Sequence, residues 1–363
     1  MKTVQIVTQM EGGGAQRVGI VLQDELEKRG EQSELWFLYV KRSTYMDQPN
    51  IQVILPYQPK HVFDYYKIIM LLFKKLVAEK PKVIISHTHY SNVIVQPIAW
   101  LLGVANRIAV QHNPVESYPL LARGLDVVLG TIGCYTTNVV VSESVLSSLK
   151  NYPNKYLQKT QQINNGVFVG ESSGNVLSMK EKLGIHENSQ VIINVGRLSQ
   201  QKNQLLLIEM LAYLSDVHLL IVGDGELRSK LVKEAKKREY SDRIHFLGEI
   251  KPQEVVNYLK LADVFVFPSL FEAMGLALVE AMNAGLPIVA TDLPATREVL
   301  GCEFIDSAGI LVGSGDVKGF ADATRMLLNN KELADGQAAI AKQRAKRYSV
   351  DNMADAYQKC YSI

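Results

Sequence analysis

The sequence predicts an α/β protein in which mostly parallel sheets carry helices on both faces. Short apolar segments typical of buried strands alternate with segments of helical periodicity along nearly the whole chain. Glycine-rich turns follow several of these strands. A length of 363 residues suggests two domains, each large enough for its own core. We therefore expect two doubly wound domains.

The composition indicates which kinds of partner and which cellular compartment to expect. The chain is 47% hydrophobic and 21% charged, as in ordinary globular proteins, and its net charge of +2 predicts no nucleic-acid partner. Cys134, Cys302 and Cys360 lie far apart, which fits a reducing compartment and disfavours a thiolate zinc site. No signal peptide precedes the first expected strand, and no apolar run reaches about 18 residues, so we expect a cytoplasmic protein without a transmembrane helix.

The first half predicts a parallel sheet with a glycine-rich turn at its first strand. The expected strands are Val4–Val7, Ser33–Val40, Ile51–Leu55, Lys82–Ser86, Arg107–Val110 and Asn138–Val141. Gly12, Gly13 and Gly14 separate the first strand from a helix expected at Ala15–Lys28. Such a turn lets a ligand approach the backbone closely, although a purely structural turn is the alternative. The dinucleotide fingerprint is not satisfied, because Arg17 stands at its third glycine.

Three histidines follow expected strands of the first half. His87 and His89 come after one strand and His112 after another, so all three should lie on the ligand-binding edge of the sheet. We expect His112 to lie in a pocket and to hydrogen-bond a ligand. His87 and His89 are either further ligand contacts or structural histidines. A metal site is disfavoured, because no carboxylate or thiolate partners can be placed beside them.

The segment 60–82 combines an apolar helix with basic residues. A helix is expected at Phe63–Ala78, and the segment holds six lysines against Asp64 and Glu79. An amphipathic basic helix can lie on an anionic membrane. The alternative is a buried crossover helix with solvated ends.

The second half repeats the strand-loop-helix pattern after an Asn-Gly turn in 162–168, which we expect to be the hinge between domains. Expected strands are Val191–Val195, Val217–Val222, Ile244–Gly248, Val264–Phe267, Ile288–Ala290 and Ile310–Val312, with helices at Ser178–Leu183 and from the 196–203 loop to Leu214. Arg197 and Lys202 come from one strand-to-helix loop, where they suit a diphosphate. Two exposed surface cations are the alternative.

The stretch 268–291 carries the strongest signs of a ligand-binding site. Glu272 follows an apolar strand, and Glu280 lies after seven intervening residues on the second turn of a helix that should begin near Met274 or Gly275. The N–H groups of Met274, Gly275 and Leu276 would lack intrahelical partners and could hold an anion. A pair of acids that merely complement the helix dipole is the alternative.

Together these motifs resemble the GT-B glycosyltransferases, and within them the retaining family 4. The resemblance covers nearly the whole chain and is strongest in the second half. It is carried by Gly12–Arg17, Val110–His112, Asn165–Val167, Gly196–Leu198 with Lys202–Asn203, Gly223–Gly225, and the pair Glu272 and Glu280. It implies two Rossmann-like domains that face a central cleft. Two positions depart from the family pattern: Met274 stands where Phe is common and Gln16 where Glu is frequent.

The resemblance assigns roles to these residues. It implies that Glu280 binds ribose, that Arg197 and Lys202 bind pyrophosphate, and that Glu272 contacts the hydroxyls of the transferred sugar. The implied catalytic set is His112, Glu272, Arg197 and Lys202. The implied donor-binding set is Gly13, Gly14, Gly196, Arg197, Lys202, Gly248, Ile250, Glu272, Ala273, Met274, Gly275, Leu276 and Glu280.

The resemblance also implies an activity. Residues 1–165 would be the acceptor domain and 166–346 the nucleotide-sugar domain, with the helix 347–363 packed back on the first. A UDP-sugar is the favoured donor, the acceptor is a glycan or lipid-linked molecule of cell-surface glycoconjugate synthesis, and no metal or other cofactor is expected. The alternatives are a nucleotide-sugar 2-epimerase, a non-catalytic sugar-nucleotide-binding protein and an NAD-dependent dehydrogenase, the last disfavoured by the missing fingerprint.

Overall fold

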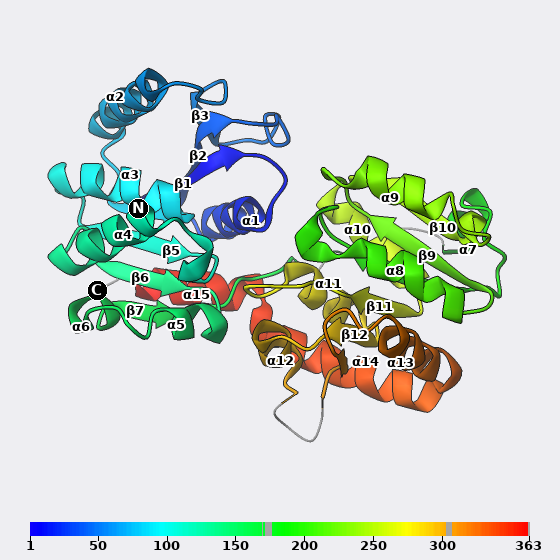
Figure 1. Cartoon of the computed structure of the whole chain (residues 1–363). Coiled ribbons are helices and arrows are strands. Elements are labelled where there is room, and N and C mark those ends of the chain that lie inside the picture. Colours follow the sequence, from blue (N-terminus) through cyan, green and yellow to red (C-terminus); the bar gives the residue numbers. More distant parts are fainter. Residues whose placement is uncertain (169, 171–175, 303–306, 362–363) are drawn as a thin grey trace. The chain divides into compact units, whose positions relative to one another are not determined.

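The computed structural model describes residues 1–168, 170, 176–302 and 307–361. The chain divides into two compact units, Met1–Val167 with Tyr348–Ile363, and Phe168–Arg347 (Figure 1). Each unit contains one open sheet in which every strand pair is parallel. The predicted α/β class with two Rossmann-like domains is therefore confirmed.

The first unit is built on a seven-stranded sheet of order β3-β2-β1-β4-β5-β6-β7. Its order reverses between β1 and β4, which makes the carboxyl ends of these two strands the expected ligand-binding crevice. The elements of this unit are β1 (Lys2–Met10), α1 (Gly14–Lys28), β2 (Gln32–Val40), β3 (Ile51–Leu55), α2 (Val62–Glu79), β4 (Val83–His87), α3 (His89–Leu101), β5 (Asn106–Gln111), η1 (Val115–Ser117), α4 (Leu120–Ile132), β6 (Thr137–Val140), α5 (Glu143–Ser148), α6 (Asn154–Leu157), β7 (Thr160–Gln162) and α15 (Val350–Lys359).

Alternating side chains of β2 show how both faces of the first sheet are covered. Trp36 and Leu38 join a core with the buried stripes of α2 and α3. Leu35 and Phe37 point to the opposite face and join a core with Ile20 of α1. A strand that is buried on both faces in this way belongs to the interior of a doubly wound sheet.

Helix α2 buries far less than the sequence suggests. Its buried residues are Ile68, Leu72 and Leu76, which form one narrow stripe at helical spacing. Exposed apolar side chains occur along the whole helix, from Phe63 to Val77. The alternative of a buried crossover helix with solvated ends is therefore wrong.

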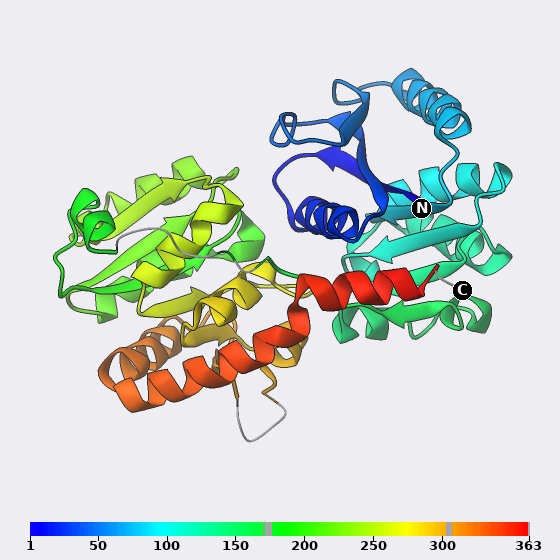
Figure 2. The same cartoon turned by 180° about the vertical axis from the view of Figure 1, so that it is seen from behind.

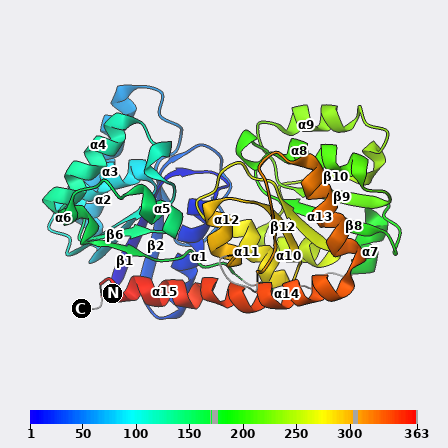
Figure 3. The same cartoon turned by 60° about the horizontal axis from the view of Figure 1, so that its bottom comes forward.

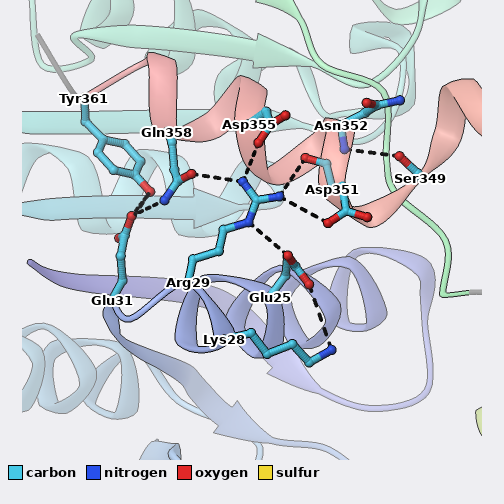
Figure 4. Close-up of polar contacts among 10 residues, drawn as sticks. All are labelled: Glu25, Lys28, Arg29, Glu31, Ser349, Asp351, Asn352, Asp355, Gln358 and Tyr361. Atoms are coloured by element: carbon cyan, nitrogen blue, oxygen red, sulfur yellow. Dashed lines mark hydrogen bonds and ion pairs between the residues drawn. The ribbon is translucent and has the colours of Figure 1, made fainter.

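The last helix, α15, belongs to the first unit, where it packs beside α1 (Figures 2 and 3). Arg29 fixes it by donating from Nη1 to Asp355 and to Gln358 and from Nη2 to the Asp351 carbonyl, while its Nε donates to Glu25 at 2.9 Å (Figure 4). These acceptors hold the pKa of the guanidinium above its usual range, against the opposing effect of burial.

The unit boundary falls two residues beyond the expected one. The Val167 N–H donates to the Tyr348 carbonyl at 2.9 Å, which attaches Val167 to the first unit. The preceding glycine, Gly166, allows this contact, since a Cβ there would lie 2.7 Å from the Cα of Val350.

The second unit is built on a six-stranded sheet of order β10-β9-β8-β11-β12-β13. The order reverses between β8 and β11, so the carboxyl ends of these strands flank the crevice of this unit. Its elements are α7 (Val176–Lys182), β8 (Gln190–Val195), η2 (Gln200–Lys202), α8 (Gln204–Met210), η3 (Leu211–Tyr213), β9 (Val217–Val222), α9 (Arg228–Ala235), η4 (Ser241–Arg243), β10 (Ile244–Gly248), α10 (Pro252–Leu261), β11 (Val264–Phe267), α11 (Leu276–Ala284), β12 (Ile288–Thr291), α12 (Pro294–Leu300), β13 (Ile310–Val312), α13 (Val317–Asn329) and α14 (Lys331–Ala345), followed by η5 (Lys346–Tyr348).

Candidate functional site

The loops after β8 and β11 start side by side in the second unit. These two strands are hydrogen-bonded neighbours, and the Asn194 Nδ2 group of β8 donates to the Val266 carbonyl of β11 at 2.8 Å. Further along, the Leu270 N–H donates to the Gln201 carbonyl at 2.8 Å, and Gln201 Nε2 donates to the Phe271 carbonyl at 2.9 Å. The two loops are therefore held together by one main-chain hydrogen bond and by side-chain amides that donate to main-chain carbonyls.

A glycine pair after β9 supports the loop that follows β8. Gly223 has φ +129, and a Cβ there would lie 2.1 Å from the Gly196 carbonyl oxygen. A Cβ on Gly225 would lie 2.3 Å from the Leu198 carbonyl oxygen. Because neither approach leaves room for a side chain, both positions require glycine. The Leu198 N–H also donates to the Asp224 carbonyl at 3.0 Å, so this motif braces the backbone on either side of Arg197.

Lys202 and Glu272 form an ion pair across the two loops. The side chains are only 17% and 6% exposed, so water screens the pair weakly. Lys202 Nζ also lies 5.1 Å from the centroid of the Phe267 ring, the last residue of β11. Lys202 and Glu272 stand out separately in the sequence, and the structure brings them together. Phe267 cannot be distinguished from a core residue by its sequence motif.

Arg197 lies in a more exposed position than Lys202. Its side chain is 44% exposed, and Nε lies 3.3 Å from a Glu226 oxygen. Exposed pairs of this kind contribute little to stability. The guanidinium can therefore change partner at small cost, whereas Lys202 would have to leave a shielded carboxylate.

Helix α11 begins at Leu276 and not at Met274 or Gly275, so the predicted start is wrong by one or two residues. The physical reason is the left-handed conformation of Gly275, at φ +87, which keeps this residue outside the right-handed helix as its N-cap. A Cβ on Gly275 would lie 3.2 Å from the Phe267 ring. The Leu278 N–H donates to the Gly275 carbonyl at 3.0 Å, which leaves the N–H groups of Leu276 and Ala277 at the helix start without intrahelical acceptors. Met274 is buried and serves the core.

Glu280 lies on the second turn of α11, as its spacing predicts, and is only 7% exposed. Four α11 residues around it, Leu278, Val279, Ala281 and Met282, are also buried. A surface acid that complements the helix dipole would be exposed, so that alternative does not fit Glu280.

The other predicted donor residues of this unit lie at neighbouring strand ends. Gly248, at φ +74, ends β10, and its carbonyl accepts from the Gly223 N–H at 2.7 Å. Ile250 follows it and is half-buried, as is Ala273 in the loop after β11. Gly196 directly follows β8.

In the first unit, His87 and His112 are joined at the carboxyl ends of β4 and β5. His87 Nδ1 lies 3.1 Å from His112 Nε2, and His87 Nε2 lies 2.9 Å from Gln5 Oε1 of β1. With the Gln5 oxygen as acceptor, His87 carries its proton on Nε2 and accepts from His112, which leaves His112 Nδ1 as an acceptor. Burial lowers the pKa of His112 to about 4 and that of His87 well below its usual value. His87 is thus a positioning residue for a neutral His112.

Near this pair lies a hydrogen-bond network that the sequence does not predict. Asp126 of α4 is fully buried and accepts from Gln111 Nε2 at 3.0 Å and from the hydroxyls of Tyr135 and Tyr156 at 2.9 and 2.8 Å. Burial raises the pKa of Asp126, although these donors oppose the effect. Because Gln111 precedes His112, the network fixes the end of β5. No periodicity in the sequence marks a carboxylate as an interior acceptor for tyrosines.

His89 differs from the other two histidines. It is buried, its ring stacks on Tyr118 with centroids 4.2 Å apart, and neither ring nitrogen has a hydrogen-bond partner among the residues that the structure describes. The interpretation as a satisfied structural histidine therefore applies to His87 but not to His89.

The glycine-rich turn of the first unit leads directly into α1. Gly14 is the first residue of that helix, one residue before the expected start, and Gly13 is its N-cap with its carbonyl accepting from the Arg17 N–H at 3.0 Å. A Cβ on Gly13 would lie 2.5 Å from Gln16 Oε1. Within the described ranges, no group of three or more His, Cys, Asp or Glu side chains could hold a metal ion, and metal independence stays a prediction.

Part of the chain is similar to a known protein family. The family model for glycosyl transferases group 1 matches residues 176–344. This match covers slightly less than half of the chain. An uncharacterized glycosyltransferase of Methanocaldococcus jannaschii is 30% identical over 265 residues, which is 65% of this chain and 62% of that relative. The UDP-Gal:alpha-D-GlcNAc-diphosphoundecaprenol alpha-1,3-galactosyltransferase of Escherichia coli is 29% identical over 287 residues, or 74% of this chain and 71% of the relative.

Solved structures extend the likeness to both units. The crystal structure of HepE from Anabaena in complex with UDP-glucose covers 99% of each chain with a TM-score of 0.84 and 18% identity. At that identity the match shows the fold, which is GT-B. The matched residues 176–344 lie within the unit that carries Lys202, Glu272 and Glu280. The relatives' names support a transferase enzyme.

Proposed function

We propose that this chain is a retaining glycosyltransferase that moves a sugar from a nucleoside diphosphate sugar, with a UDP-sugar favoured, to a glycan or lipid-linked acceptor. The observation that carries the proposal is the shielded Lys202–Glu272 pair between the loops after β8 and β11. It lies at the reversal of strand order where open α/β sheets bind ligands. The first turn of α11 follows directly, and Glu280 lies on the next turn.

The residues of this site suit the departure of a diphosphate. As the bond to the anomeric carbon breaks, negative charge grows on the leaving phosphate, and fixed donors stabilise it. Lys202 would exchange Glu272 for a phosphate oxygen, and the first-turn N–H groups of α11 would donate to the same group. Arg197 would turn from Glu226 to the diphosphate. Glu272, relieved of Lys202, would accept from sugar hydroxyls, and Glu280 from the ribose.

In this proposal the first unit supplies a neutral acceptor at His112. Its Nδ1 lone pair can accept a hydrogen bond from the transferred sugar or the acceptor hydroxyl. In the retaining mechanism that the family resemblance implies, the leaving phosphate helps to deprotonate the acceptor hydroxyl, so no protein nucleophile and no metal ion enters the step. Gly13 and Gly14 would lie at the phosphate in such an enzyme.

Two comparisons support UDP over other nucleotides. HepE was solved with UDP-glucose, and the Escherichia coli relative is named for a UDP-Gal donor and a diphosphoundecaprenol acceptor. By analogy we propose a lipid-linked or glycan acceptor in cell-surface glycoconjugate synthesis, met at the cytoplasmic face of the membrane. Electrostatic attraction between the lysines of 60–82 and anionic lipids would support this placement. Within the ranges described, no helix combines the length and apolar character needed to cross a bilayer.

A thermal-shift panel of UDP, GDP, ADP, TDP and NAD tests the proposal. A ligand that binds the native state raises the melting temperature by mass action. We expect UDP to stabilise the wild type and Glu280→Ala to abolish that shift. A matched control is Glu234→Ala, which removes a partly exposed acid of α9 that pairs with Lys237. If NAD alone raises the melting temperature, or if no nucleotide does, the proposal fails.

Two alternatives use the same nucleotide pocket and are separated by products. A 2-epimerase would release free sugar from its donor without an acceptor, and a non-catalytic binding protein would leave the donor intact. We expect slow donor hydrolysis without acceptor, with the anomeric configuration of the sugar retained on transfer. An epimerised free sugar as the main product would contradict the proposal.

A further inference from the structure

A second pair of histidines lies in the second unit, at the other end of its strands from the proposed donor site. His218 is the second residue of β9, and His245 is the second residue of β10. His218 Nδ1 lies 3.1 Å from His245 Nε2, and the ring centroids are 5.4 Å apart. Gly223 and Gly248, which support the donor loops, lie at the carboxyl ends of the same two strands. The pair is therefore separate from the site described above.

The alternation of side chains along the two strands brings these histidines together. Leu219 of β9 and Ile244 of β10 are register partners and point into one hydrophobic core. Because neighbouring residues of a strand point to opposite faces, His218 and His245 emerge on the other face of the sheet. β10 is an edge strand, and both histidines are half-buried. Ions in solution therefore reach this pair more easily than the buried histidine pair of the first unit.

The surroundings of the pair favour neutral rings, the form in which imidazole binds metals. Burial lowers the pKa of His218 and that of His245. Two cations that lower the pKa of His218 further and two carboxylates that oppose them are Arg243, Lys180, Asp242 and Asp216. A neutral ring can carry its single proton on the outer nitrogen. Lone pairs are then left on His218 Nδ1 and His245 Nε2, the two atoms that face each other.

The separation of these two nitrogens suits chelation of a metal ion. A tetrahedral zinc ion with Zn–N bonds of about 2.0–2.1 Å holds two ligand nitrogens roughly 3.3 Å apart. The observed separation of 3.1 Å differs from that value by only about 0.2 Å. A turn of each ring would direct both lone pairs at an ion beside the line that joins the nitrogens. The ion would then replace the hydrogen bond between the rings.

We propose that His218 and His245 bind one divalent transition-metal ion and that this ion clamps the edge strand β10 to β9. Zinc, nickel and copper form the class of ion, because imidazole is a favoured ligand of all three. In the part of the chain that the structure describes, no third His, Cys, Asp or Glu completes a cluster, so water would fill the remaining positions. A clamp at the amino ends of the strands is structural and adds no metal to the transfer step. It goes beyond the proposed function and does not depend on it.

Calorimetric titration and thermal shift of the full chain without an affinity tag test this site. We expect one Zn²⁺ or Ni²⁺ ion per chain and a higher melting temperature with either, since a ligand of the native state stabilises it. Nickel is the second probe because Cys302 and Cys360, which are free thiols, could bind zinc on their own. Mg²⁺, which prefers oxygen ligands, should have no effect. Because both rings are neutral, binding should release no proton, and heats measured in buffers of different ionisation enthalpy should agree.

Glutamine variants assign the ion to the pair. His218→Gln and His245→Gln should each weaken Ni²⁺ binding roughly 10- to 100-fold. The glutamine amide can still hydrogen-bond the remaining ring, so the metal-free variants should keep nearly the wild-type melting temperature. The matched controls are His186→Gln, at an exposed histidine of the same unit, and His112→Gln, in the buried pair of the first unit. Both controls should bind Ni²⁺ like the wild type.

Three results would overturn the proposed metal site. The first is unchanged Ni²⁺ affinity in His218→Gln or His245→Gln, and the second is an equal loss of affinity in either control. The third is no binding by the wild type at a roughly tenfold excess of ion over protein, or equal stabilisation by Mg²⁺. The contact between His218 and His245 would then be a structural hydrogen bond only.

Discussion

The two units share the order of six strands but place different chemistry at the point where that order reverses. In the second unit the reversal between β8 and β11 carries an ion pair, Lys202 with Glu272. In the first unit the reversal between β1 and β4 carries a neutral chain, Gln5 to His87 to His112. The fold therefore determines where a ligand can bind, and the side chains after each strand determine what kind of ligand. A charged donor suits the second unit, and a hydroxyl-bearing acceptor suits the first.

The largest expected effect comes from the backbone packing that supports the charged site. Gly223→Ala would place a Cβ 2.1 Å from the Gly196 carbonyl oxygen at a φ of +129. We expect a loss of about 3 kcal/mol in the free energy of unfolding, from strain and displacement of the neighbouring loop. Urea denaturation measures this loss, and UDP affinity should fall as well because the Arg197 loop moves.

The control for this variant is Gly336→Ala in α14. A Cβ at that helical position meets no atom within 4 Å. Alanine should stabilise the helix by about 0.5–1 kcal/mol. An equal change in the free energy of unfolding in the two variants would mean that the Gly223 contact does not support the loop.

The second prediction concerns the cation of the second unit. Lys202→Met removes a charge-assisted contact worth about 1.5–3 kcal/mol, so UDP affinity should fall roughly 10- to 100-fold. Calorimetric titration with UDP measures the change. Lys237→Met is the matched control, because Lys237 also pairs with a glutamate but its side chain is 56% exposed. If both variants bind UDP equally well, the shielded pair is structural and the contrast between the units disappears.

The third prediction concerns the neutral histidines of the first unit. The folded-state pKa of His112, about 4, lies below its value of about 6.5 in the unfolded chain. Between these values the unfolded state binds more protons, so stability is complete above pH 6.5 and is lost as the pH falls toward 4. Each pH unit in this window should remove up to about 1.4 kcal/mol per histidine.

Urea denaturation at several pH values measures this dependence. His112→Gln retains an amide nitrogen near the position of Nε2 and removes one titrating group, so its stability should fall less steeply with decreasing pH. The control His186→Gln changes an exposed histidine and should keep the wild-type slope. An unchanged slope in His112→Gln would show that His112 is already protonated at neutral pH or is not buried.

The sequence predicted the strands well because β-strands in such sheets are apolar on both faces. Ile51–Leu55, Val217–Val222 and Val264–Phe267 agree residue for residue with the structure. Helix ends were less predictable. The start of α11 depends on the left-handed conformation of Gly275, which follows from its approach to the Phe267 ring and not from any local pattern.

The site residues also differ in how far the sequence alone could identify them. Lys202 and Glu272 could be selected because charges beside a buried strand and a helix start are conspicuous in a sequence. The contact between Lys202 and Glu272 could not be predicted, because it depends on the adjacency of β8 and β11. Asp126 was missed altogether, because only the tertiary structure brings Tyr135 and Tyr156 to a carboxylate on α4. Burial of polar groups is decided by partners that are distant in the sequence.

The smallest expected effect tests a further difference between the units: the first is completed by a helix that follows the second in sequence. Arg29→Met removes the contacts to Asp355, Gln358 and the Asp351 carbonyl that hold α15 against α1. Solvent screens the two aspartates, whose side chains are 58% and 77% exposed. We therefore expect a loss of only about 1 kcal/mol in the free energy of unfolding. Hydrogen exchange should localise it to α15, with the second unit's UDP thermal shift unchanged. A loss spread over both units would instead mean that α15 stabilises the whole chain, and the two sheets could not then be treated as separate folding units.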